Sequence, residues 1–103
     1  MEEMKILPDI EHRILHDFGR NRITDIQEKF EVLRRKFSDI YKEKPSPRII
    51  RCIIHLASGN EAVLDQMIDA ALQDWRDVIY WAEYNEKDKR IFNGNERFSF
   101  RLE

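Results

Sequence analysis

Residues 47–84 read PRIIRCIIHLASGNEAVLDQMIDAALQDWRDVIYWAEY, and this stretch decides the fold. Ser46 and Pro47 suit the cap and the first position of a helix, and Gly59 suits its end. The residues between them are apolar around most of the circumference, which predicts a buried central helix. Asn60 then caps a further helix, whose apolar residues keep a helical spacing to the end of the stretch.

The last helix carries one apolar stripe from Leu64 to Ala82, so it is expected to be a single helix or two nearly collinear ones. Asp74 is the expected break, because Asp74 and Asp77 can cap a new first turn with carboxylates that the helix dipole favours. The stripe should lie against the isoleucine-rich helix that precedes it.

Two more helices are expected before this stretch. Pro8 suits the first position of one helix, and Gly19 suits its end. The other spans Ile23 to Lys42, and the prolines that follow prevent its continuation. Its apolar residues step by three and four, as in a coiled-coil seam. They are Ile23, Ile26, Phe30, Leu33, Phe37 and Ile40.

The sequence therefore predicts an all-α bundle of four or five helices in residues 1–84. Residues 85–103 are expected to form a mobile tail or a short hairpin. Asn93-Gly94 favours a type I′ turn, and Phe98, Phe100 and Leu102 alternate with polar residues, although an isolated hairpin is marginally stable.

Composition favours a cytoplasmic protein with no membrane partner. The 103 residues are 42% apolar, enough for one modest core, and no run approaches the length of a membrane span. Cys52 is the only cysteine, which excludes an internal disulfide and fits a reducing compartment. On an apolar helix it is expected to be a small core side chain.

Charge is unevenly distributed, with +5 over residues 29–51 and −4 over residues 52–82. These blocks could attract each other within the fold or form two faces for partners. Nucleic-acid binding through the basic segment 29–51 is an alternative. It is disfavoured because the helix after Gly59 presents Glu61, Asp65 and Asp69 in the sequence, which phosphates would repel. Arg48, Arg51 and His55 are expected on the polar edge of the central helix.

Asp9, His12 and His16 fall on one side of the first helix and are weak candidates for a metal site, with an exposed polar face as the simpler interpretation. The carboxylates of Asp74, Asp77 and Glu83 raise the question of acid–base catalysis. Because Arg76 lies among them and no nucleophile accompanies them, a structural ion-pair cluster of Asp74, Arg76 and Asp77 is favoured. No catalytic residue and no cofactor is predicted.

Tyr80, Trp81 and Tyr84 lie off the apolar stripe at the end of the last helix. Because tryptophan and tyrosine dominate interface hot spots, these residues are the interaction candidates. The alternative is that the first helix or the tail covers them.

The run Ala71-x-x-Asp74-Trp75-Arg76-Asp77-Val78-Ile79-x-x-Ala82-Glu83-Tyr84 resembles the C-terminal half of a group of short uncharacterised bacterial proteins. The resemblance covers about forty residues and implies a small, bacterial, cytoplasmic, all-helical protein. It transfers no functional residue.

The function predicted from the sequence is a non-enzymatic protein-interaction module. It could form a homodimer through the aromatic end of the last helix or through the seam of the second helix. The alternatives are a metal-binding or small-molecule-binding protein that uses Asp9, His12 and His16, and a nucleic-acid-binding protein.

Overall fold

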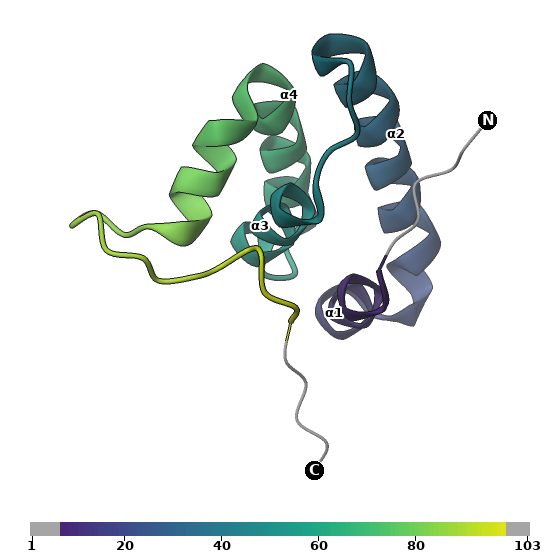
Figure 1. Ribbon diagram of the computed structural model, residues 1–103. Coiled ribbons are helices and arrows are strands. Elements are labelled where there is room, and N and C mark those ends of the chain that lie inside the picture. The colour runs from purple at the N-terminus through teal and green to yellow at the C-terminus, as the bar shows by residue number, and fades with distance from the viewer. Residues whose placement is uncertain (1–6, 99–103) are drawn as a thin grey trace.

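The computed structural model describes residues 7–98 and shows a small helical fold (Figure 1). Within these residues the chain forms four α-helices and one 3₁₀ turn, and it forms no strand beyond a single antiparallel bridge between Tyr84 and Arg90. The all-α prediction is confirmed. The elements are α1 (Pro8–Phe18), η1 (Arg20–Arg22), α2 (Ile23–Tyr41), α3 (Pro47–Ala57) and α4 (Glu61–Glu83).

Local capping explains where the helices begin and end. The Ser46 hydroxyl accepts a hydrogen bond from the amide of Ile49 at 3.3 Å, so it caps α3. The Asn60 side chain accepts from the amides of Ala62 and Val63, at 2.9 and 3.2 Å, and so caps α4. Gly59 between these helices has a φ of 86°, and a Cβ there would lie 2.9 Å from the carbonyl oxygen of Asp17. Only glycine lets the α3–α4 turn approach the end of α1 this closely.

The core forms around α3, which packs most extensively against α4. The buried apolar residues of α3 are Ile49, Ile50, Cys52, Ile53, Ile54 and Ala57. Four residues of the α2 seam, Ile26, Phe30, Leu33 and Phe37, are also buried in this core. The seam is therefore used within the chain, and the predicted homodimer through it is wrong. Ile40 alone of the seam residues is exposed, by 53%.

α4 breaks at Asp74, where φ is −161° and ψ is 102°. The predicted position is correct, but the two halves are not collinear, because the ribbon changes direction there (Figure 1). The Asp74 carboxylate accepts from the amide of Arg76 at 3.1 Å and so caps the second half. Ala71 and Leu72 lie in the last turn of the first half of α4. Their carbonyls accept hydrogen bonds from the Tyr41 hydroxyl, at 3.4 and 3.2 Å.

The segment after α4 lies against the helices. The amide of Ile91 donates to the carbonyl of Glu83 at 2.7 Å. The ring of Phe92 stacks on His55 with centroids 3.9 Å apart, and the guanidinium of Arg13 lies over the ring of Phe98 at 4.8 Å. The mobility predicted for residues 85–103 stays a prediction, and Phe100 and Leu102 lie outside the described residues.

Asn93 and Gly94 do not form the predicted type I′ turn. That turn requires positive φ at both central residues, and neither residue has one. The reason is that the Gly94 peptide group is held by hydrogen bonds to residues of the bundle, rather than by a partner strand.

Candidate functional site

An exposed aromatic surface lies at the end of α4 and comprises Tyr80, Trp81 and Tyr84. Tyr80 is 50% exposed and Trp81 48% exposed, whereas Tyr84 is half-buried. The rings of Tyr80 and Tyr84 stack with centroids 5.7 Å apart. The expectation that the tail covers this group therefore does not hold for Tyr80 and Trp81 within the described residues.

Polar contacts fix the orientation of the aromatic surface. The Tyr80 hydroxyl donates to the carboxylate of Asp88, and this hydrogen bond raises the pKa of Tyr80. The guanidinium of Arg90 lies over the Tyr84 ring, 5.9 Å from its centroid. Tyr84 also forms the backbone bridge to Arg90. Two of the three rings are thus held in place by contacts within the chain.

Two residues after Trp81, the side chain of Glu83 is fully buried and accepts hydrogen bonds from several donors. It accepts from Arg48 through Nε at 2.8 Å and Nη2 at 2.7 Å, and from Arg90 Nη2 at 2.6 Å. The amide of Gly94 donates to it at 3.0 Å. The pKa of Glu83 is lowered to about 2, chiefly by the hydrogen bond from Arg48. The hydrogen bonds from Arg90 and the amide of Gly94 add to this effect, and burial opposes it. The carboxylate is therefore charged and its oxygens are already engaged.

Sequence reasoning grouped Glu83 with Asp74 and Asp77 and did not identify this cluster. The sequence does contain a signal for the burial of Glu83, because this residue follows Ile79 by four positions and adjoins Ala82, and both are buried. A charged residue on a buried stripe requires a partner, and Arg48 of α3 supplies it.

Cys52 lies beside the same cluster, and its predicted burial is confirmed. Its Sγ is 3.7 Å from Oε2 of Glu83. Burial, together with the negative charge of Glu83, raises the pKa of the thiol to about 12. This thiol is therefore protonated at neutral pH and acts as a packing group in the folded chain.

A second buried ion pair joins α1, α3 and the C-terminal segment. Arg51 donates to both oxygens of Asp9, from Nε at 2.9 Å and from Nη2 at 3.2 Å, and its Nη1 donates to the carbonyl of Gly94 at 3.2 Å. The amide of Phe98 completes the site by donating to Asp9 at 3.0 Å. The prediction that Arg51 lies on a polar edge is wrong, because this pairing allows it to be buried.

The metal-site candidates are not brought together. Burial acts to raise the pKa of Asp9, but the hydrogen bonds from Arg51 and Phe98 outweigh it, and the pKa is lowered. Asp9 is therefore committed to Arg51, while Nδ1 of His16 lies 2.9 Å from Asp17 and His12 is exposed. Across residues 7–98, no group of three or more histidine, cysteine, aspartate or glutamate side chains is arranged to hold a metal ion.

The predicted polar cluster lies on the surface. Arg76 donates to both oxygens of Asp74 at 3.0 Å, with the two side chains 75% and 36% exposed, and Asp77 is exposed. These groups face solvent and each other. Asp74 accepts from the backbone amide of Arg76 at 3.1 Å as well as from its guanidinium. Of the two donors expected for Asp74, the backbone or a basic group of α2 or α3, the structure therefore shows the backbone.

Several cations of the basic segment 29–51 are paired within the chain. Lys29 contacts Asp65 at 2.7 Å, which joins the basic block to the acidic block as internal attraction predicts. Arg34 pairs with Glu31. Arg48 and Arg51 are also held in the buried clusters, so part of the positive charge of this segment is neutralised within the chain.

Comparison of the chain with protein-family models, curated proteins and solved structures found no match. Among residues 7–98, no helix combines the length and the apolar character needed to cross a bilayer.

Proposed function

We propose that the chain is a non-enzymatic protein-interaction module that binds a partner protein through the aromatic surface of Tyr80, Trp81 and Tyr84. The observation that carries this proposal is the half exposure of Tyr80 and Trp81 on a helix whose end is anchored by the buried Glu83. Aromatic side chains on a rigid support lose little entropy when they bind, so they contribute strongly to affinity.

The chemistry of the carboxylates supports a role other than catalysis. Glu83 is saturated with donors and has a pKa of about 2, which suits a structural anion and does not suit a proton acceptor near neutral pH. Asp74 is paired with Arg76 on the surface. We infer a bacterial, cytoplasmic setting from the resemblance of the run from Ala71 to Tyr84 and from the single free thiol.

The test is affinity capture from bacterial lysate with the wild-type chain, the double variant Tyr80→Ala/Trp81→Ala and the control Gln66→Ala, which changes an exposed residue in the other half of α4. A partner should be retained by the wild type and by the control and lost with the double variant. Binding of the purified partner should shift the emission of Trp81 to shorter wavelength in a Trp75→Phe background. Equal capture by all three chains, or capture of nothing, would contradict the proposal.

A further inference from the structure

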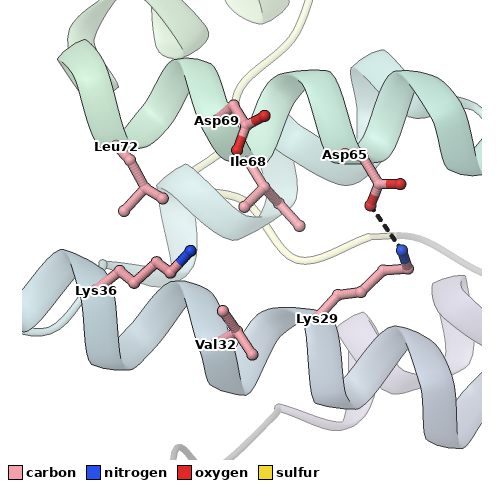
Figure 2. A pocket seen from close by; sticks show the side chains of 7 residues that line it. All are labelled: Lys29, Val32, Lys36, Asp65, Ile68, Asp69 and Leu72. Atoms are coloured by element: carbon pink, nitrogen blue, oxygen red, sulfur yellow. Dashed lines mark hydrogen bonds and ion pairs between the residues drawn. The ribbon is translucent and has the colours of Figure 1, made fainter.

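A groove of about 330 Å³ runs between α2 and the first half of α4 (Figure 2). Its apolar lining comes from Val32, Ile68 and Leu72. Both helices run in the same direction along it, because Arg22 pairs with Glu61 at one end and Tyr41 contacts Leu72 at the other.

The two rims of the groove carry opposite charge. The α2 rim has Lys29 and Lys36, and the α4 rim has Asp65 and Asp69 (Figure 2). Lys29 and Asp65 are paired across the groove at 2.7 Å. Lys36 and Asp69 are both exposed, and neither has an ion pair within residues 7–98. One cation and one anion thus remain available on opposite sides of an apolar floor.

We propose that this groove is the contact surface of a weak symmetric homodimer. A two-fold axis that runs along the groove places each positive rim opposite the negative rim of the other protomer. Lys36 of each protomer then faces Asp69 of the other, and the apolar floors of the two grooves face each other at the centre. The two pairs of helices together form a four-helix arrangement.

Charge complementarity selects a second copy as the occupant. An acidic partner or a nucleic acid would be attracted to the α2 rim and repelled by the α4 rim. A basic partner would be repelled by the α2 rim and attracted to the α4 rim. The same chain, turned by the two-fold axis, matches both rims at once. Because the contact involves one face of two helices, the interface is small and the dissociation constant is in the micromolar range or weaker.

The test is sedimentation velocity at low salt, over roughly 10 to 500 µM. The wild type should pass from monomer to dimer. Lys36→Glu alone, and Asp69→Lys alone, should each raise the dissociation constant of the dimer by about tenfold or more. The reason is that each substitution turns both symmetry-related contacts between positions 36 and 69 into contacts between like charges. An equimolar mixture of the two variants should regain association as a heterodimer, in which both cross-pairs are again attractive.

The outcomes separate this inference from the proposed function. Because Lys36 and Asp69 make no ion pair in the described chain, both variants should melt like the wild type, and Trp81→Ala should dimerise normally. A wild type that stays monomeric, or a mixture that stays monomeric, would overturn the inference. Loss of the dimer in Trp81→Ala with no effect of either charge variant would assign self-association to the aromatic surface instead.

Discussion

Two acid–arginine groups on α4 differ in surroundings although both are built from the same chemistry. Asp74 pairs with Arg76, two residues away, and both side chains are exposed to solvent. Glu83 pairs with Arg48 of α3 and with Arg90 of the following segment, and its side chain is fully buried. Water and salt screen the first pair, so it contributes little to stability.

The buried group is the one that connects parts of the chain. Glu83 joins α4 to α3 through Arg48, and it holds the C-terminal segment through Arg90 and the amide of Gly94. Removing such a charge would leave cations with incomplete pairing beside an apolar core, which is costly. Proximity in sequence is therefore a poor guide to structural importance, whereas burial is a good one.

Glu83→Gln should have the largest effect. The substitution keeps the size of the side chain but removes the charge that Arg48 and Arg90 share, so the free energy of unfolding should fall by about 3 kcal/mol. Urea unfolding at pH 7 measures this change. Asp77→Asn is the matched control, because Asp77 is exposed and its substitution should change stability by less than about 0.5 kcal/mol. Equal stability of the two variants would remove the distinction between the groups.

Low pH should remove the stabilisation by the charged Glu83 from the wild type. The pKa of Glu83 is lowered from 4.5 to about 2 in the folded chain, so its stabilisation is fully present above pH 4.5 and is lost as the pH falls through about 2. The difference in unfolding free energy between the wild type and Glu83→Gln should therefore shrink over this range. Urea titrations at several pH values test this, and a difference that stays constant down to pH 2 would contradict it.

Gly94→Ala should have an intermediate effect, because its Cβ would lie 2.8 Å from Sγ of Cys52 and 2.9 Å from the carbonyl oxygen of Arg48. The segment must shift to relieve this overlap, at a cost of about 1 to 3 kcal/mol. Cys52 should then react faster with a thiol reagent, because the segment that covers it opens more often. Asn95→Ala, at an exposed neighbouring position, should leave the reaction rate at the wild-type value.

Asp74→Ala should have the smallest effect of these changes, lowering the melting temperature by a few degrees at most. It removes the cap at the break of α4 as well as the ion pair with Arg76. Asp74→Asn separates the two contributions, since asparagine keeps the cap and loses the charge. We expect Asp74→Asn to have the same melting temperature as the wild type when unfolding is followed by circular dichroism. A loss as large as that of Glu83→Gln would show that the exposed pair matters as much as the buried one.

Much of the fold follows from local signals in the sequence. Ser46 and Asn60 cap their helices through their own side chains, and the break at Asp74 uses a donor two residues away. Each of these features depends on a few adjacent residues, so a single sequence suffices to predict it.

The clusters around Glu83 and Asp9 could not be predicted in the same way. Arg48 and Glu83 are 35 residues apart, and Arg51 and Asp9 are 42 residues apart. Helical periodicity indicates which face of a helix is buried, but it does not indicate which charged residue of another helix lies opposite. The position of Gly94 between the two clusters also depends on this tertiary arrangement.

The hydrogen bond from the amide of Phe98 to Asp9 has a consequence for the order of folding. It spans 89 residues of sequence, and closing so long a loop is entropically unfavourable until the intervening helices have formed. By contrast, α3 and α4 are joined by a short turn and can pack together early. We expect the amides of Gly94 and Phe98 to exchange with deuterium through local opening, and those in the centre of α3 to exchange only when the whole chain unfolds.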